Sequence, residues 1–533
     1  MMNSRVKRDM MMTVRGLSVA QRGRYFIFFC LFSVVLLALS FRGASIAMAA
    51  GPEAHIKGEF GPLHNWPIIP IAMMLMPDGR VFAYGTNPSG VQGAKMYFAI
   101  WDPSMGTGID AFDVLPNTTE TDIFCAGQAH IPGTGEALII GGDGRVNNIR
   151  NYAVNDVNIF DPSTDTLVRQ TQSMAFKRWY ATAVTLPNGE HIVLGGRNDR
   201  LFKGSKTAPA TEATYSSTPE VRATDGNWRT LTSATSDYAY GALGASSWFY
   251  PRAWVNPQGD LFILAHNGNM YNLNTSGDGV LSKYTNKIQA SKASLSSVMF
   301  APGKILTIRK DRKAIVVDLN NPVKPIVSGA GFLAKDRLYG TATVLANGHV
   351  WVNGGSSTGN DLAGAALDTE LWNPVTNTWK ATASAATARL YHSASLLLPD
   401  GTVITGGGGA AGPLTQLNGE IYYPPYLFKT DGSGELAPRP DINDAPATPI
   451  SWDQQFSIEA SESIARVTLV RVGAATHAFN QETRFFDLPF LAEGNIVTVQ
   501  SPASPNLAPP GHYLLFVWNA SGVPSTARFI QIG

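Results

Sequence analysis

A short turn-and-strand pattern recurs seven times between about residue 75 and residue 410 of the 533-residue chain. In each copy, a turn that ends in glycine leads into an apolar, β-rich run, and several runs close with Gly-Gly. Asn-Gly and Asp-Gly turns between apolar runs are strong hairpin signals, because the central residues of a type I′ turn need positive φ. The glycines that end the seven turns are Gly79, Gly135, Gly189, Gly259, Gly303, Gly348 and Gly401. The sequence therefore predicts seven hairpins in a repeated unit.

The spacing of these glycines predicts a β-propeller. Successive turn glycines are separated by 56, 54, 70, 44, 45 and 53 residues, so each interval can hold a four-stranded sheet. Gly-Gly endings are typical of kelch blades, whereas a set of separate sandwich domains would not give so regular a period. The 52 glycines and 33 prolines favour an all-β, turn-rich fold. We expect a seven-bladed kelch-type β-propeller over residues 51–430.

The composition changes after the last repeat. Residues 431–450 are rich in proline, glycine and aspartate and are predicted to be a linker. Short alternating runs follow, such as ARVTLVRVG and HYLLFVWN. They predict a compact C-terminal immunoglobulin-like β-sandwich over residues 451–533.

The N-terminus has the composition of a targeting segment. Basic residues within the first 25 positions precede an apolar run from Tyr25 to Phe41, and a small-residue cleavage motif ends at Ala49. We expect residues 1–50 to be a signal peptide and the mature protein to be secreted, that is extracytoplasmic. An uncleaved N-terminal anchor is the alternative. Cleavage would leave no stable membrane span.

Cysteine content and charge narrow the function further. Removal of the signal peptide takes away Cys30 and leaves Cys125 as the one cysteine of the mature chain. A buried, inert thiol is the simplest interpretation of a single cysteine. The formal net charge is +1, and no basic stripe follows the first 25 residues, which argues against nucleic acid as a partner.

Four unusual residues share one position in the repeat, where the first strand of a blade begins. Cys125 precedes its turn glycine by ten residues, Tyr180 by nine, and Tyr391 and His392 by ten and nine. The first strand of a kelch blade is the innermost one, so these side chains are expected to converge at one mouth of the central channel. Taken singly, each tyrosine could be a packing residue and the histidine a hydrogen-bonded structural residue. Independent core residues need not share one phase, so the combination favours a functional site.

The residue types at this mouth indicate a copper site. Imidazole nitrogen and phenolate oxygen together suit Cu(II), and a tyrosinate is also redox-active. One histidine is too few for such a site, so a second nitrogen ligand has to come from elsewhere in the chain. The other histidines are His55, His64, His130, His191, His266, His349, His477 and His512. Spacing alone does not choose among them.

Five segments carry a family resemblance. They are DIFCAGQ (122–128), RWYATAVTLPNG (178–189), RLYHSASLLLPDGTVITGGGG (389–409), VRVGAATHAFN (470–480) and PPGHYLLFVWNASGVPS (509–525). In this order, and over nearly the whole mature chain, they resemble the galactose oxidase and glyoxal oxidase family of copper-radical oxidases. The YHS…LLPDG and THxxN pieces are the specific ones, because a Gly-Gly repeat alone is a weak signal.

The resemblance implies the composition of the site. Cys125 would be joined to Tyr180 by a thioether bond formed with copper and O2, and Tyr180 would be a copper ligand that carries the protein radical. Tyr391 would be the axial ligand and the base for the substrate hydroxyl. His392 and His477 would be the imidazole ligands of one copper ion per chain. Since His477 lies in the C-terminal domain, a loop of that domain would reach down the propeller axis.

The resemblance also implies an activity. A small aldehyde or alcohol would be oxidised and O2 reduced to hydrogen peroxide, as in glyoxal oxidase. A primary-alcohol or carbohydrate oxidase of the galactose type is the alternative. From another class, a non-catalytic glycan-binding propeller would bind no copper and would keep Cys125 as a free thiol. We expect a monomer whose partners are the small-molecule substrate and O2.

Two features differ from galactose oxidase or extend the pattern. Galactose oxidase has a tryptophan that stacks over the cross-linked tyrosine, and this chain has Asn198 at that position, so the shielding of the tyrosine must differ. The Arg-Trp-Tyr triplet that ends at Tyr180 is closer to the glyoxal oxidase branch. Tyr250 and Tyr339 share the repeat phase of Tyr180 and could line the mouth of the pocket, but packing is the simpler expectation for both.

Overall fold

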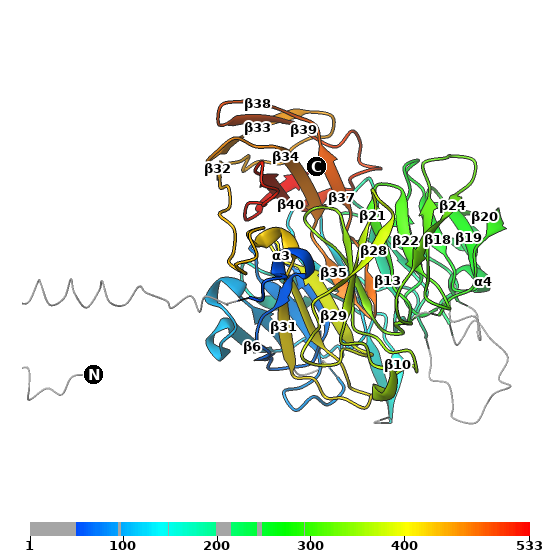
Figure 1. Cartoon of the computed structure of the whole chain (residues 1–533). Helices are drawn as coiled ribbons and strands as arrows, with labels where there is room; N and C mark the ends of the chain where they lie inside the picture. The colour runs from blue at the N-terminus through cyan, green and yellow to red at the C-terminus, as the bar shows by residue number, and fades with distance from the viewer. Residues whose placement is uncertain (1–49, 94–96, 148, 199–214, 242–247, 293) are drawn as a thin grey trace, which may run out of the picture. The chain divides into compact units, whose positions relative to one another are not determined.

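The computed structural model describes residues 50–93, 97–147, 149–198, 215–241, 248–292 and 294–533 (Figure 1). The first 49 residues of the predicted signal peptide, Cys30 among them, lie outside these ranges. No helix in the described ranges is long and apolar enough to cross a membrane. Strands dominate, and the described helices are single turns. These are α3 (Ala54–Lys57), α4 (Asp237–Tyr240) and the 3₁₀ segments η1 (Pro103–Met105), η2 (Ile109–Ala111), η3 (Thr232–Ala234), η4 (Leu362–Gly364) and η5 (Pro425–Leu427).

Seven antiparallel blades follow one another along the described chain, as the glycine spacing predicts. Blade 1 consists of β3 (Pro70–Leu75), β4 (Val81–Gly85), β5 (Tyr97–Trp101) and β6 (Phe112–Pro116). Blade 2 consists of β7 (Gly127–His130), β8 (Ala137–Ile140), β11 (Val157–Asp161) and β12 (Thr166–Arg169). Blade 3 consists of β13 (Thr182–Thr185), β14 (His191–Leu194), β15 (Glu220–Arg222) and β16 (Trp228–Thr230). Blade 4 consists of β17 (Arg252–Val255), β18 (Leu261–Leu264), β19 (Asn269–Asn274) and β20 (Val280–Lys287).

The last three blades repeat the arrangement. Blade 5 consists of β21 (Ser297–Ala301), β22 (Lys304–Ile308), β23 (Lys313–Asp318) and β24 (Ile326–Phe332). Blade 6 consists of β25 (Thr341–Val344), β26 (Val350–Asn353), β27 (Thr369–Asn373) and β28 (Thr378–Thr382). Blade 7 consists of β29 (Ser393–Leu397), β30 (Val403–Gly407), β31 (Asn418–Tyr423) and β1 (Glu59–Phe60), and β2 (His64–Asn65) also pairs with β31. A separate hairpin joins β9 (Asp143–Val146) to β10 (Ile149–Ala153).

The blades close into a ring at two levels. The first strands lie side by side from blade 2 to blade 4 and from blade 5 to blade 7, and β29 of the last blade lies next to β3 of the first. At the outside, β1 pairs with β31, with Phe60 opposite Tyr422, so the segment before blade 1 supplies the outer strand of blade 7. Tyr422 in turn stacks on Trp351 of blade 6, with ring centroids 4.4 Å apart and planes at 6°. The predicted propeller is confirmed.

The C-terminal residues form the predicted sandwich of two four-stranded sheets, whose strands group together in Figure 1. One sheet contains β32 (Ile442–Asp444), β33 (Gln455–Ala460), β39 (Ile496–Gln500) and β38 (Phe490–Glu493). The other contains β37 (Phe485–Leu488), β34 (Arg466–Arg471), β40 (Gly511–Trp518) and β41 (Arg528–Ile532). Strand β32 falls inside the segment expected as a linker, because Ile442 is buried in the sandwich core. We propose limits of 51–430 for the propeller and 451–533 for the sandwich, with β32 as an added edge strand.

One hairpin of the C-terminal part leaves the sandwich and joins the propeller. Strands β35 (Ala474–Thr476) and β36 (Phe479–Asn480) pair with each other, and β35 pairs with β3 of blade 1, with Thr476 opposite Ala72. The hairpin also contacts first strands of blades 2, 5, 6 and 7. It therefore lies within the ring that the first strands form.

Three blades contain the same buried ion pair, which the sequence analysis did not identify. In each, an arginine two residues before a tyrosine meets a glutamate of the third strand, and it also donates to the carbonyl of a glycine that begins a Gly-Gly pair. The second carboxylate oxygen accepts the N–H of the residue three before the arginine. The pairs are Arg178–Glu220, Arg337–Glu370 and Arg389–Glu420. This ion pair fixes the chain next to the tyrosine, just before the first strand of the blade.

Substitution of one of these glutamates should destabilise the protein strongly. In Glu420→Gln the Arg389 guanidinium, 1% exposed, would remain buried without its countercharge. We expect a loss of about 3–5 kcal/mol of unfolding free energy, measured by chemical denaturation. Asp487→Asn removes an exposed ion pair with Arg466 and serves as the control, with an expected loss of about 1 kcal/mol or less. Equal effects of the two substitutions would contradict a stabilising role for the buried pair.

Candidate functional site

The residues at the shared repeat position have an unusual backbone conformation. Cys125, Tyr180, Tyr250, Tyr339 and His392 all have positive φ, between 42° and 70°. This left-handed region is uncommon for residues other than glycine and costs about 1–3 kcal/mol where the surroundings impose it. Residues strained in this way cluster at active sites and ligand sites.

Hydrogen bonds between blades hold these left-handed turns. The Tyr180 N–H donates to the Cys125 carbonyl at 3.0 Å, and the Tyr250 N–H donates to the Tyr180 carbonyl at 2.8 Å. The Tyr339 N–H donates likewise to the carbonyl of Ser294, at 2.6 Å. The main chain of one blade thus positions the side chain of the next.

The five predicted site residues meet at the end of the ring where these turns lie. The Cys125 sulfur is 3.6 Å from Nε2 of His392 and 3.4 Å from Nε2 of His477. The hydroxyls of Tyr180 and Tyr391 are 2.6 Å apart, and the rings of Tyr391 and His392 stack with centroids 3.8 Å apart. All five are buried except Tyr391, which is partly exposed. Residues from three blades and from the C-terminal hairpin are therefore brought to one point.

The hydrogen bonds of the two histidines define their tautomers. Nδ1 of His392 is 2.6 Å from the Gly409 carbonyl, which can only accept, so Nδ1 carries the proton. Nδ1 of His477 is 2.6 Å from the Thr476 hydroxyl, which donates its own proton to the Ile71 carbonyl and so accepts from the imidazole. Both Nε2 atoms are left with a lone pair facing the same point. Metal-ligating histidines are typically oriented by this kind of bond.

Burial keeps this group of side chains neutral. It lowers the pKa of His392 to about 3, and burial together with His392 and Arg252 lowers the pKa of His477 well below its usual range. It also raises the pKa values of the Cys125 thiol and of the Tyr180 and Tyr391 phenols well above their usual ranges. Unprotonated imidazoles thus lie beside protonated O–H and S–H groups, and a bound cation would favour the ionised, ligating forms of those groups.

Among the described residues, one group of three or more histidine, cysteine and acidic side chains could hold a metal ion, and it consists of Cys125, His392 and His477. Their ligand atoms lie within 4.8 Å of one another. With the two phenol oxygens, the donor set is the nitrogen and oxygen mixture that suits Cu(II). The residues present fit a copper ion.

Sequence spacing left the second imidazole undecided, and the structure places His477 beside His392. Three other candidates point elsewhere, because His64 accepts from Trp66, His130 bonds to Glu482, and His191 bonds to the His130 carbonyl.

A buried carboxylate anchors the hairpin that carries His477. One oxygen of Glu482 accepts from the backbone N–H and from Nδ1 of His130 in blade 2, both at 3.0 Å. The other accepts from the Thr185 hydroxyl of blade 3 at 2.5 Å and from Arg471 of the sandwich at 3.4 Å. Burial alone would raise the pKa of Glu482, but Arg471 and His130 outweigh it and hold that pKa below the usual range. One carboxylate therefore joins two blades to the sandwich.

An aromatic shell that the sequence analysis missed surrounds Tyr180. Phe249 stacks on the Tyr180 ring, with centroids 4.4 Å apart and planes at 25°, and Trp248 meets it edge-on at 5.9 Å. Phe249 precedes the left-handed Tyr250 and belongs to the next blade, so no search within the blade of Tyr180 could find it. The Trp-Phe-Tyr run that ends at Tyr250 was the available signal. A ring therefore covers Tyr180 although Asn198 does not supply one.

The two further tyrosines at the shared phase form walls of the site. Tyr250 is fully buried, meets Tyr180 edge-on at 5.3 Å and donates its hydroxyl to the Ala126 carbonyl at 3.2 Å. Tyr339 packs edge-on against Tyr391, with centroids 5.1 Å apart. Each of them therefore packs against a tyrosine of the site.

Comparisons with known proteins show what this chain is similar to. The profile of the family "Galactose oxidase-like, Early set domain" matches residues 439–532. A galactose oxidase of Gibberella zeae is 28% identical over 510 residues, covering 89% of this chain and 70% of its own length. The aldehyde oxidase GLOX1 of Arabidopsis thaliana is 25% identical over 569 residues, covering 91% and 86%. The solved structure of a fungal alcohol oxidase of the AA5 family in complex with copper has a TM-score of 0.76 at 23% identity, covers 89% of this chain and 99% of its own, and shares the fold.

Removal of the anchoring charge should loosen the hairpin. Glu482→Gln would leave Arg471 buried without its countercharge, and we expect a loss of about 3–5 kcal/mol of unfolding free energy at pH 7. Because the pKa of Glu482 is lower in the folded protein, its contribution exists above the usual carboxyl value of about 4.3 and is lost as the pH falls. The difference between wild type and variant should therefore shrink in acid.

The measurement is denaturant unfolding at neutral and acidic pH, with Glu435→Gln as control because it removes only an exposed ion pair with Lys429. A difference between wild type and Glu482→Gln that stays constant with pH would show that Glu482 acts through packing alone.

Proposed function

The chain belongs to the galactose oxidase and glyoxal oxidase family of copper-radical oxidases, and we propose that it oxidises a small aldehyde or alcohol with O2 and releases H2O2. The observation that carries this proposal is the convergence of one thiol, two phenols and two unprotonated imidazoles from four distant segments. A non-catalytic propeller has no need of these groups at a single buried point, where four of the five residues have the strained, positive-φ backbone.

We propose that Tyr180, Tyr391, His392 and His477 hold the copper ion. The imidazoles offer Nε2 lone pairs that are already oriented by Gly409 and Thr476. Copper, when bound, supplies one-electron redox chemistry and the positive charge that favours ionised phenols. The buried surroundings exclude water and strengthen each of these electrostatic interactions.

Cys125 is proposed to form a thioether bond with the ring of Tyr180. The thiol and the phenol are close enough that each affects the pKa of the other, and the Cys125 carbonyl accepts the Tyr180 N–H at 3.0 Å. Formation of the C–S bond removes the thiol hydrogen and one ring hydrogen, and O2 accepts both as H2O2. The bond would fix the Tyr180 ring beneath Phe249 and lower the potential of its radical.

The two tyrosines divide the substrate chemistry. Tyr391 is partly exposed, so it is the phenol that a substrate can reach, and it would accept the substrate O–H proton. Tyr180 would take a hydrogen atom from the neighbouring carbon, and one further electron leaves the substrate. O2 takes up the two electrons and two protons as H2O2. An alcohol gives an aldehyde, and an aldehyde entering as its hydrate gives a carboxylic acid.

Two substrate classes remain in competition. A glyoxal-type aldehyde is favoured by the Arg-Trp-Tyr triplet and by Asn198, which leaves no tryptophan at the position where galactose oxidase has one. The alternative is a primary-alcohol or carbohydrate oxidase, which the likeness to galactose oxidase supports. We further propose, from the composition of residues 1–50, that the enzyme is exported, and that it acts as a monomer.

Treatment of copper-free protein with Cu(II) in air should remove two hydrogen atoms from its intact mass. Peptide mapping should then join Cys125 to Tyr180. Cys125→Ser should bind copper without this mass change, whereas Tyr250→Phe, a change in a neighbouring buried tyrosine, should show it in full. A titratable thiol at Cys125 after treatment would contradict the cross-link.

Peroxide release should identify the substrate class. With copper-loaded enzyme, we expect faster H2O2 production from glyoxal, methylglyoxal and glycolaldehyde than from galactose. A preference for galactose would favour the carbohydrate oxidase alternative. If protein whose cross-link has formed produced no H2O2 from any of the four substrates, both oxidase assignments would be contradicted.

A further inference from the structure

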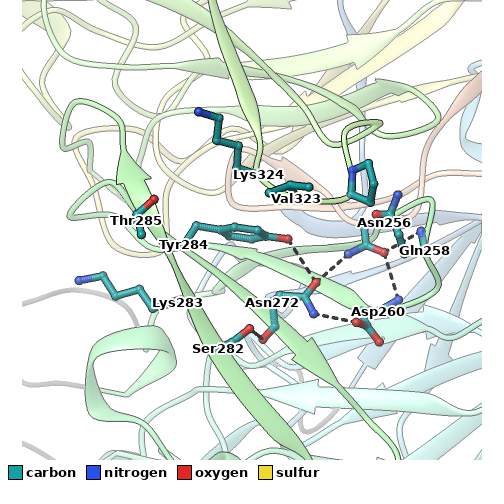
Figure 2. Close-up of a pocket in the computed structure, with 11 residues that line it drawn as sticks. Asn256, Gln258, Asp260, Asn272, Ser282, Lys283, Tyr284, Thr285, Val323 and Lys324 are labelled. Carbon is teal, nitrogen blue, oxygen red and sulfur yellow. Dashed lines mark hydrogen bonds between the residues drawn. The ribbon is translucent and has the colours of Figure 1, made fainter.

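A polar pocket of about 440 Å³ lies between blades 4 and 5, away from the residues discussed so far (Figure 2). Its walls come from the β17–β18 turn, from strands β19 and β20, and from the loop between β23 and β24. The volume lies within the range of small-molecule sites.

The pocket is at the opposite end of blade 4 from the metal centre. Tyr250 comes just before β17 and borders Tyr180, whereas Asn256 comes just after β17 and lines the pocket. The two residues are six positions apart along a segment that contains strand β17, which corresponds to roughly 20 Å. A ligand in the pocket would therefore not touch the metal centre.

A chain of amide and carboxylate groups forms one wall and is held in place. Nδ2 of Asn256 donates to Oδ1 of Asn272 at 2.8 Å, and Nδ2 of Asn272 donates to Asp260 at 2.7 Å (Figure 2). Oδ1 of Asn256 accepts the backbone N–H groups of Gln258 and Asp260, at 3.0 Å and 3.1 Å. Asn256 is 3% exposed, so the arrangement is rigid before any ligand arrives.

This wall can both donate and accept further hydrogen bonds. Each of the two asparagine amides uses one N–H in the chain of bonds and has a second N–H, and the Asp260 carboxylate has further lone pairs. The Tyr284 hydroxyl, 3.4 Å from Oδ1 of Asn272, can also accept. A hydroxyl group is donor and acceptor at once, so a ligand with several neighbouring hydroxyls matches the wall.

Charge and apolar surface narrow the ligand class. The Asp260 carboxylate lies within the hydrogen-bonded wall and disfavours an anion, and Figure 2 shows the ammonium groups of Lys283 and Lys324 pointing away from that wall. The Tyr284 side chain lies between Asn272 and the segment that contains Val323 (Figure 2). An aromatic ring with a polar tip offers an apolar face beside hydrogen-bonding groups. Sugar rings combine apolar C–H faces with equatorial hydroxyls in the same way.

We infer that this pocket binds a neutral saccharide unit and acts as a second, non-catalytic binding site. The ligand would hydrogen-bond to Asn256, Asp260 and Asn272 and pack on Tyr284. The inference goes beyond the proposed oxidase activity and does not depend on it, because no residue of the pocket belongs to the metal centre.

Isothermal titration of the full-length, copper-loaded protein tests the inference. The ligands are cellohexaose, xylohexaose, mannohexaose, maltohexaose and chitohexaose, with hexagalacturonate as an anionic counterpart. We expect saturable binding of at least one neutral hexasaccharide and none of hexagalacturonate. Asp260→Asn and Tyr284→Ala should each weaken that binding by about tenfold or more.

Matched variants separate the pocket from general effects. Glu190→Gln changes the residue that follows the turn glycine of blade 3, as Asp260 does in blade 4, and Tyr238→Ala removes an exposed tyrosine outside the pocket. Both should keep wild-type affinity, and all four variants should keep the copper-dependent mass change at Cys125 and Tyr180. Binding of no neutral hexasaccharide, preferential binding of hexagalacturonate, or equal losses in the pocket and control variants would each overturn the inference.

Discussion

The pairing of β35 with β3 is the contact on which the candidate site depends. Cys125, Tyr180, Tyr391 and His392 belong to blades of the propeller, but His477 reaches them because its hairpin is hydrogen-bonded to the first strand of blade 1. A hairpin buried in this way must satisfy its polar groups and pay for any charge that it brings inside. Glu482 meets this requirement, since four donors from blade 2, blade 3 and the sandwich surround its carboxylate. The contact that joins the sandwich to the propeller therefore also brings the last side chain to the site.

The propeller in turn has to hold strained residues in place. Five residues at the mouth of the ring have a left-handed backbone conformation. Each such turn costs free energy that neighbouring contacts must offset. The buried Arg–Glu pairs of blades 3, 6 and 7 lie two residues before three of the tyrosines at this mouth. Their arginines bind carbonyls of Gly195, Gly354 and Gly407, whose positive φ and close neighbours leave no room for a side chain. The Gly-Gly endings of the repeat thus serve the site as well as the strands.

Sequence reasoning reached the blades and most of the site because both follow local rules. Turn glycines mark hairpins wherever they occur, and a fixed distance from them placed Cys125, Tyr180, Tyr391 and His392 at one end of the ring. It could not choose His477 by spacing, because a contact between hairpin and propeller has no local signature, and only the family resemblance named it. Phe249 was missed for a related reason, since it covers a tyrosine of the preceding blade. The edge strand β32 was hidden in a proline-rich segment because a single buried residue, Ile442, decides its pairing.

The acid–base state of the centre explains why such reactive groups can be buried. Without a cation, neutral imidazoles, phenols and a thiol occupy the site, and burial favours all of these forms. A divalent ion with two ionised phenols also carries no net charge, so the low-dielectric surroundings need not oppose that state either. If the bound ion lost one positive charge, the uptake of a proton by one of the two phenols would restore neutrality. Tyr391 is the more exposed of the two, and its hydroxyl lies 2.6 Å from that of Tyr180. This charge balance supports the proposal that Tyr391 exchanges a proton with the substrate and that the shielded Tyr180 ring, beneath Phe249, carries the radical.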